Sequence, residues 1–472
     1  MSENHLPVTP GGTLTKEKAG LTGQPEDPTC VKRHRKDLFM VKYYATVVLL
    51  AVLTLNTQAQ TDTESNSIET RIVELEQKLK QLQDELAQQK QAATPSVSTA
   101  PAADEQAIAA AVSKAFEKHQ AEQPKLPEWI NKVSLYGDFR YRYEWTDDES
   151  KIADRNRNLI QARIGIKGTI NEEFDFNFRL ASGGNNSPTS NNQALDDSFS
   201  SKNLWIDQAY VDYHPASIKD VKVFAGKIAN PYYTVGNSDL LLDSDVTPEG
   251  IAAVYKTKLS DTLDLFGTAG GFYVDERQLD ADTSLWAVQG GSTWHFGEEK
   301  KSHLTAGAGY YDYGNTIGRA GLGSDATQFY GNTSTGGLYD SDFNLVQGFA
   351  EVGTPLGGLP LRVFGDVIKN TAAESNEDTA WLAGVSLGKT AAPGTWSFAY
   401  NYRDVEADAL LGVLAEATFG GGGTNVKGHK FSTNYQLAKN TQVGLTYYDA
   451  ERTRGGITTD HDVIFADFTI KF

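Results

Sequence analysis

The sequence has 472 residues, enough for two or three soluble domains or for one large barrel with appendages. Its formal net charge of -18 argues against a nucleic-acid partner, because phosphate binding needs a basic face. After about residue 60, no apolar run approaches the roughly 18 residues of a membrane-spanning helix, which excludes a helical membrane protein. Barrels cross lipid with alternating strands of about ten residues, so they stay compatible with this composition.

The N-terminus predicts a secretory leader. Residues 40–59 contain a lysine, an apolar core and small residues before a cleavage point, so they are typical of a signal peptide. We expect the mature protein to begin at Gln60 and residues 1–39 to be a mis-assigned extension upstream of the true start at Met40; the alternative is a cytoplasmic tail. The sole cysteine, Cys30, then lies outside the mature chain, which suits an oxidising periplasm.

Residues 60–90 predict an amphipathic helix that joins protomers. Its apolar seam repeats at spacings of four and three and consists of Ile68, Ile72, Leu75, Leu79, Leu82 and Leu86. A single helix of about three heptads is marginal in water, so we expect a periplasmic coiled coil that supports a homotrimer. The alternative is a helix folded against its own chain. Residues 91–130 predict a flexible linker with a short helix.

Residues 131–472 have a hydrophobic period of two, which is typical of β-strands. In residues 133–145, the aliphatic and most aromatic side chains share one face, while Asp138, Arg140, Arg142 and Glu144 share the other. Polar residues recur on the second face of several later segments. An apolar outside and a charged inside indicate a transmembrane barrel with a wet lumen rather than a soluble sandwich.

Sixteen candidate strands lie near Val133, Ile160, Phe174, Leu204, Val221, Ile251, Leu263, Leu285, Leu304, Leu345, Leu361, Trp381, Trp396, Phe431, Val443 and Val463. Short turns alternate with longer polar connections, just as short periplasmic turns alternate with longer external loops in outer-membrane barrels. The sequence therefore predicts an all-β transmembrane barrel of about 16 antiparallel strands with an N-terminal α-helical coiled-coil extension. Such a barrel is wide enough to hold water.

Two strands carry special signals. Near Gln208 the apolar parity of residues 204–213 switches, which predicts either a bulge or a contact between protomers. The last strand alternates regularly and ends on Phe472, which resembles the terminal aromatic signal of bacterial outer-membrane proteins. That resemblance implies recognition by the barrel-assembly machinery and insertion among outer-membrane lipids.

Several segments resemble the proteobacterial putative porin family: residues 135–142 (LYGDFRYR), 178–182 (FRLAS), 188–190 (PTS), 205–215 (WIDQAYVDYHP), 226–231 (GKIANP) and 243–250 (DSDVTPEG). The resemblance is densest over residues 135–250 and extends to Phe472 by architecture alone. It implies an outer-membrane pore. We expect passive diffusion of small hydrophilic solutes through that pore.

The resemblance to trimeric porins also implies a constriction, because their loop after the fifth strand folds into the barrel. The corresponding connection here carries the acidic candidates Asp239, Asp243, Asp245 and Glu249. The candidates for a facing basic wall are Arg140, Arg142, Arg163 and Arg179. Opposed charges would set a transverse field that selects polar solutes by size and charge. The alternative is that these charges pair with one another as struts of the lumen wall.

Other function classes find little support. An enzyme would need a nucleophile, a base and an orienting group held together, and no Gly-x-Ser-x-Gly motif is present. The histidines of the predicted barrel are scattered over turns and strand ends, so we predict no catalytic residues, no metal site and no cofactor. The remaining alternative is an outer-membrane adhesin or structural tether whose loops or coiled coil bind a partner.

Overall fold

The computed structural model describes residues 132–184 and 187–472. The predicted N-terminal extension, signal peptide, coiled coil and linker lie outside the described residues. Within the described part of the chain, no helix is long and apolar enough to cross a membrane.

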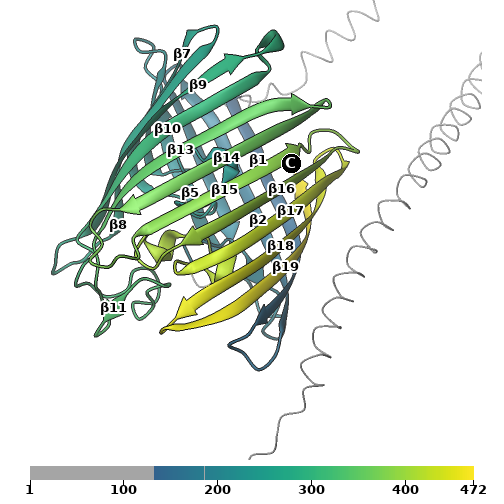
Figure 1. Ribbon diagram of the computed structural model, residues 1–472. Coiled ribbons are helices and arrows are strands. Elements are labelled where there is room, and N and C mark those ends of the chain that lie inside the picture. The colour runs from purple at the N-terminus through teal and green to yellow at the C-terminus, as the bar shows by residue number, and fades with distance from the viewer. Residues whose placement is uncertain (1–131, 185–186) are drawn as a thin grey trace, which may run out of the picture. The chain divides into compact units, whose positions relative to one another are not determined.

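Sixteen strands form a closed antiparallel barrel (Figure 1). They are β1 (Val133–Asp148), β2 (Arg155–Asn171), β3 (Phe174–Ser182), β5 (Leu204–Tyr213), β6 (Val221–Lys227), β7 (Glu249–Ser260), β8 (Leu263–Asp275), β9 (Thr283–Phe296), β10 (Ser302–Gly314), β13 (Phe343–Leu356), β14 (Leu359–Asn370), β15 (Thr379–Gly388), β16 (Trp396–Val405), β17 (Val426–Ala438), β18 (Thr441–Arg454) and β19 (Ile457–Lys471). Each pairs with the next strand along the chain, and β1 pairs with β19 to close the ring. The predicted strand number and order are confirmed.

The longer connections gather at the end of the barrel opposite the C-terminus (Figure 1). We name four of them: L2 (residues 183–203), L3 (residues 228–248), L5 (residues 315–342) and L7 (residues 406–425). L2 contains the short strand β4 (Gln193–Ala194), and L5 contains the hairpin β11 (Ser334–Thr335) and β12 (Leu338–Tyr339). L3 contains the 3₁₀ turn η2 (Val235–Asn237), and L7 contains η4 (Gly412–Leu414) and η5 (Phe419–Gly421); η3 (Glu298–Lys300) lies in a turn at the other end.

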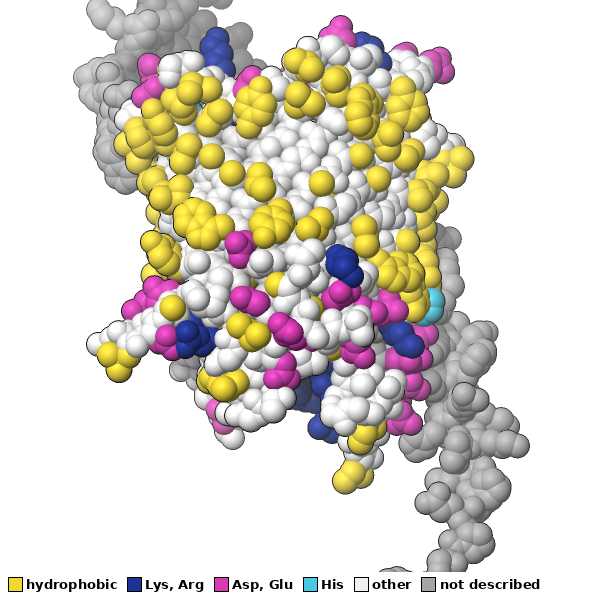
Figure 2. Space-filling view, turned by 60° about the vertical axis from the view of Figure 1, so that its left-hand side comes forward, with side chains coloured by type: hydrophobic (Ala, Val, Ile, Leu, Met, Phe, Trp, Pro, Cys, Tyr) yellow, Lys and Arg dark blue, Asp and Glu magenta, His cyan; other side chains and the backbone are white. Residues whose placement is uncertain are grey.

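The strands present an apolar face outward, as the alternation predicts. On β1, Leu135, Phe139, Tyr141 and Tyr143 are all exposed, while Glu144 on the other parity is buried. On the face that Figure 2 shows, hydrophobic side chains form bands across the barrel, and acidic and basic side chains are concentrated toward its ends. This distribution fits a lipid-facing belt between two aqueous rims.

Strand β5 carries a bulge. Arg179 of β3 pairs with Gln208, and Leu180 pairs with Ile206, so Asp207 is the extra residue. The bulge resets the parity, which lets both Asp207 and Gln208 turn their side chains inward, where they are buried. Of the two sequence interpretations at this point, the bulge is correct.

The C-terminal residue completes the seam between β19 and β1. The backbone of Phe472 exchanges two hydrogen bonds of 3.0 Å with Gly137. A Cβ atom at Gly137 would lie 2.6 Å from the Phe472 ring, so glycine leaves the space that the ring occupies on the outer face. The described structure thus gives Phe472 a packing role; the assembly signal remains a prediction.

The interior has two different halves. Inward-facing side chains of β7–β10 and β13–β15 form one apolar cluster with L3 and L7, including Phe272, Leu285, Phe349, Phe364 and Ile368. The strands β1–β3 and β16–β19 turn more polar and charged side chains inward, although β16–β19 also contribute Val405, Val426, Tyr448, Val463 and Phe465 to the same apolar cluster. We call the half formed by β7–β10 and β13–β15 the packed wall, and the half formed by β1–β3 and β16–β19 the charged wall.

Candidate functional site in the barrel lumen

L3 folds into the barrel because its apolar residues match the packed wall. Val235, Leu240 and Leu242 are all at most 4% exposed, which is unusual for a loop between two strands. The ring of Tyr233 stacks against Phe266 and Phe349, with centroids 5.2 Å and 5.5 Å away, and the two phenylalanine centroids are 6.4 Å apart. Burial of these side chains supplies the free energy that keeps the loop inside.

A close backbone contact also fixes L3 against the packed wall. Gly236 has a φ of 60°, and a Cβ atom there would lie 2.5 Å from the Phe364 ring. Its N–H donates to Glu351 Oε2 at 2.6 Å. Only glycine combines this backbone conformation with such a close approach to a ring.

The opposite side of L3 reaches the charged wall through a buried ion network. Asp239 Oδ1 accepts from Arg403 of β16 at 2.7 Å, and Asp239 Oδ2 accepts from Lys430 of β17 at 2.9 Å. Glu416 of L7 accepts from the same two side chains at 2.8 Å and 3.1 Å. The two cations hold the pKa of Asp239 well below its usual range, against the effect of burial, so this carboxylate stays ionised. The network binds L3 and L7 to one another and to the wall.

Asp243 has a different environment. Its two carboxylate oxygens accept from the backbone N–H groups of Asp245 at 2.8 Å and Ala417 at 2.9 Å. Burial raises the pKa of Asp243 to about 8, and the neighbouring Asp245 contributes to the rise. Because the backbone N–H of Asp243 also donates to Leu414 at 2.9 Å, this residue is a second link between L3 and L7.

The other two acidic candidates diverge. Asp245 Oδ1 lies 3.5 Å from Arg163 Nη1 of the charged wall, and its carboxylate also contacts Asn191 of L2. Glu249 is the first residue of β7, lies on the outward parity and forms an exposed ion pair with Lys227 at 2.7 Å. Only Asp245 of the four acids thus meets one of the four predicted arginines.

The four predicted arginines do share the charged wall. Arg142 makes a two-pronged contact with Asp467 of β19, with both distances 2.7 Å. Arg163 pairs with Asp138 at 2.9 Å, and Arg179 pairs with Asp207. Arg140 donates to the amide oxygen of Asn192 at 2.7 Å, and its Nε has no hydrogen-bond partner among the described residues. Three of the four arginines are thus paired with carboxylates.

Sequence reasoning missed the strongest contacts of L3. Arg403 and Lys430 were recognisable as inward-facing residues of late strands, but nothing in the sequence connects them with an acid about 160 to 190 residues earlier. Glu416 was equally hidden inside a Gly-rich loop. The alternation along the two strands does place both basic residues on the inward, polar face, and this is the only sequence signal that points to them.

A second hub joins the external loops. The carboxylate of Asp408 in L7, which is fully buried, accepts from Thr333 at 2.9 Å and 2.6 Å, from Ser341 at 3.0 Å and from Ser375 at 2.9 Å. Asn332 of L5 donates to two backbone carbonyls of L7, each at 2.7 Å. L5 and L7 therefore form one hydrogen-bonded cap above the packed wall.

The charged wall keeps open space at its loop-bearing end. A cavity of about 540 Å³ lies between L7, β19 and the first two strands, lined by Glu144, Asp148, Arg157, Arg452 and His461 among others. On β1, Glu144 is followed inward by Arg142 and Arg140 on the same face. The polar surface of this cavity is thus continuous with the arginines of the charged wall.

Comparison with solved structures shows similar barrels at low sequence identity. The chain is similar to Pseudomonas putida OprB, with 10% identity, a TM-score of 0.47, and coverage of 73% of this chain and 95% of that one. It is also similar to Salmonella typhi OmpF, with 13% identity, a TM-score of 0.45, and coverage of 72% and 97%. For the Vibrio cholerae OmpT variant lacking loop L8, the identity is 16%, the TM-score 0.42, and the coverage 71% and 98%.

No curated protein matches the sequence. The family described as "Putative porin" matches residues 148–344 and 359–472, which include fourteen of the sixteen barrel strands, all but β1 and β13. The chain therefore belongs to the Putative porin family, as an outer-membrane porin for passive diffusion.

Proposed function

We propose that small hydrophilic solutes cross this barrel along the charged wall, with L3 setting the narrow point. The observation that carries the proposal is the position of L3, whose apolar residues bury against one wall while Asp245 reaches Arg163 on the other at 3.5 Å. Polar solutes that displace water from this wall can replace their hydrogen bonds to water by hydrogen bonds to the acids and arginines. Apolar solutes cannot form such bonds and therefore gain no stabilisation there.

The charge balance of this wall favours weak ion selectivity. The four arginines face the four carboxylates of Asp138, Asp207, Asp245 and Asp467. Paired charges create a local transverse field but little net potential along the pore. Arg140 is the exception, because its hydrogen bond goes to an amide rather than to a carboxylate. We infer a neutral or slightly anion-preferring passage for polar molecules.

Measurement of solute size limits tests the proposal. In liposome swelling assays, the mature porin should admit monosaccharides faster than trisaccharides, and replacing residues 234–246 by a short Gly-Ser link should remove most of that difference. The control removes residues 334–338, which form an exposed hairpin tip in L5 and should leave the size limit unchanged. An unaltered size limit after L3 shortening would refute the proposed role of L3.

We also propose that the mature protein is a homotrimer with its N-terminal helix in the periplasm, after removal of a signal peptide at residues 40–59. Support comes from the heptad pattern of residues 60–90. Deletion of residues 60–125 tests this role: loss of trimers with intact single-channel current supports it. Envelope fragility with retained trimers would instead favour the structural-tether alternative.

A further inference from the structure

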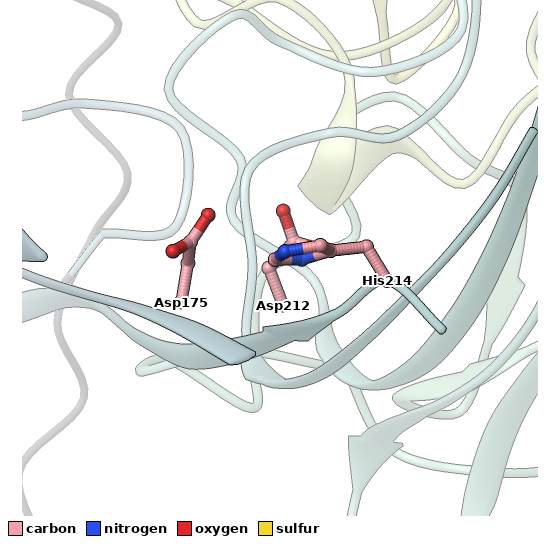
Figure 3. A group of neighbouring side chains, drawn as sticks. All are labelled: Asp175, Asp212 and His214. Carbon is pink, nitrogen blue, oxygen red and sulfur yellow. The ribbon is translucent and has the colours of Figure 1, made fainter. Parts of the chain in front are cut away.

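We propose that the porin binds a divalent transition-metal ion at Asp175, Asp212 and His214. These residues lie on the lumen wall, at the end of the barrel where the C-terminus of the chain also lies. This inference is independent of how solutes pass. Each of the three residues offers one ligand atom, and these atoms all lie within 4.8 Å of one another. Figure 3 shows the imidazole of His214 extending toward both carboxylates.

Strand pairing creates this group. Asp175 of β3 and Asp212 of β5 are direct cross-strand partners, so their side chains leave the same face of the barrel side by side. His214 follows Asp212 by two residues and therefore returns to the same side just after β5 ends. The three residues were not grouped at the sequence level, because Asp175 is distant in the chain and the histidines looked scattered.

The ligand atoms are left unsatisfied by the rest of the described structure. Asp212 is only 8% exposed, yet its Oδ1 has no hydrogen-bond partner among the described residues, and neither has the buried Nδ1 of His214. These two atoms face one another at 3.6 Å, too far for a hydrogen bond. A buried, unpaired carboxylate oxygen is costly, and a bound cation removes that cost.

The geometry is close to what zinc needs. Ligands held about 2.0–2.2 Å from Zn²⁺ in a tetrahedron lie roughly 3.3 Å apart. The Asp212 and His214 atoms are already near that separation at 3.6 Å, and the ligand atom of Asp175 lies within 4.8 Å of both, so a small side-chain rotation brings it into the same coordination sphere. One imidazole with two carboxylates is a ligand set suited to Zn²⁺ and similar ions, with water in the remaining position.

The surroundings orient the site. Lys222 donates to the other oxygen of Asp212, Oδ2, at 2.7 Å, which turns Oδ1 toward His214. A partner of this kind fixes a ligand while leaving its metal-facing atom free. The side chain of His214 is 29% exposed, so an ion can enter from water. A bound dication would add positive charge to this end of the lumen.

The competing interpretation is a simple ion pair between protonated His214 and Asp212. Zinc titration of the full mature protein in detergent micelles, after chelator treatment, separates the two. We expect one Zn²⁺ per barrel with a micromolar dissociation constant, and a loss of affinity of at least tenfold in both His214→Ala and Asp175→Asn. The matched control is His295→Ala, which removes a histidine paired with a single carboxylate, Asp264, at 2.8 Å.

The folding of each variant is checked by its heat-modifiable electrophoretic mobility. A loss of zinc binding is attributed to the substitution only when the variant barrel is folded. Zinc added to bilayers should also lower cation conductance in the wild type and in His295→Ala but not in His214→Ala. Unchanged zinc affinity in folded His214→Ala and Asp175→Asn would overturn the proposal, as would the absence of binding to the wild type.

Discussion

The packed wall and the charged wall belong to one sheet and share the same alternation, yet their inward-facing side chains differ in polarity and in exposure. On β9, β13 and β14, inward residues such as Leu285, Leu345 and Ile368 are at most 3% exposed because loops cover them. On β1 and β2, inward residues such as Arg142 and Arg163 keep 11% and 23% of their side chains exposed. The difference teaches that strand parity defines which face is inside, whereas the loops decide whether that inside is dry.

The largest effect is expected where the two walls are joined. Arg403→Ala leaves Asp239 and Glu416 with Lys430 as their only cation, so two buried carboxylates share one charge partner. Breaking a buried ion network in this way costs about 3–5 kcal/mol. We expect a lower melting temperature together with larger and noisier single-channel currents as L3 loosens.

The control for this variant is Lys258→Ala, which removes an exposed ion pair with Asp261 in a turn. That change should alter neither melting nor current, because exposed pairs contribute little. If Arg403→Ala melted and conducted like the wild type, the network would not be the joint between the walls.

A second change addresses the charged wall alone. Arg140→Ala combined with Arg142→Ala removes two positive charges and leaves Asp467 without its two-pronged partner. The reversal potential in a salt gradient should therefore shift toward cation selectivity, with little effect on the packed wall. Arg319→Ala, in L5, is the matched control because its partner Asp280 is exposed. Identical reversal potentials in all three proteins would contradict a conducting role for this wall.

A graded effect should follow pH at the contact between L3 and L7. Burial raises the pKa of Asp243 from the ordinary 3.8 to about 8. Between these values an unfolded chain is ionised while the packed loop keeps its proton, so the stability of the packed state falls as the pH rises through this window and then levels off. Channel noise should increase from pH 5 to pH 8 in the wild type.

Asp243→Asn tests that assignment, since the amide cannot ionise. Its noise should be nearly independent of pH, although the substitution also sacrifices one of the two backbone hydrogen bonds to the carboxylate. If Asp243→Asn retained the full pH dependence of the channel noise, that dependence would come from another titratable group.

The smallest effect on the folded protein is expected at the seam. Phe472→Ala removes a ring that is 56% exposed and rests on Gly137, so the melting temperature should fall only slightly. If Phe472 is an assembly signal, the same change should reduce the amount of barrel inserted in cells much more than it reduces melting. Equal reductions in the two measurements would leave only the packing role.

Much of this architecture follows from local sequence, and the rest depends on distant contacts. The sixteen strands, their order and the parity switch near Gln208 can be predicted because a period of two and turn residues act locally, whereas the bulge behind that switch is decided by the strand pairing. The packed wall is also detectable in the sequence, because β9 and β13 have apolar residues on both faces, as in Leu285 with Trp286 or Leu345 with Val346. Strands of that kind indicate cover on both sides.

The partners of the acidic residues could not be predicted in the same way. Asp239 finds Arg403 and Lys430 only after L3 crosses the barrel, and Glu249 turns outward because β7 begins at that residue. Loop paths of this length are set by tertiary packing rather than by local propensity. The same reason hides the proximity of Asp175 to His214.

Cysteine accessibility offers the most direct test of the central claim that the charged wall conducts and the packed wall does not. Because Cys30 is the only cysteine, a protein expressed from residue 60 has no background thiol. Ser432→Cys places a thiol on the inward face of β17, and Ala380→Cys places one on the inward face of β15, where the residue is fully buried. A charged thiol reagent should reduce the current through the first variant and leave the second unchanged; a current block at Ala380→Cys with none at Ser432→Cys would contradict the account.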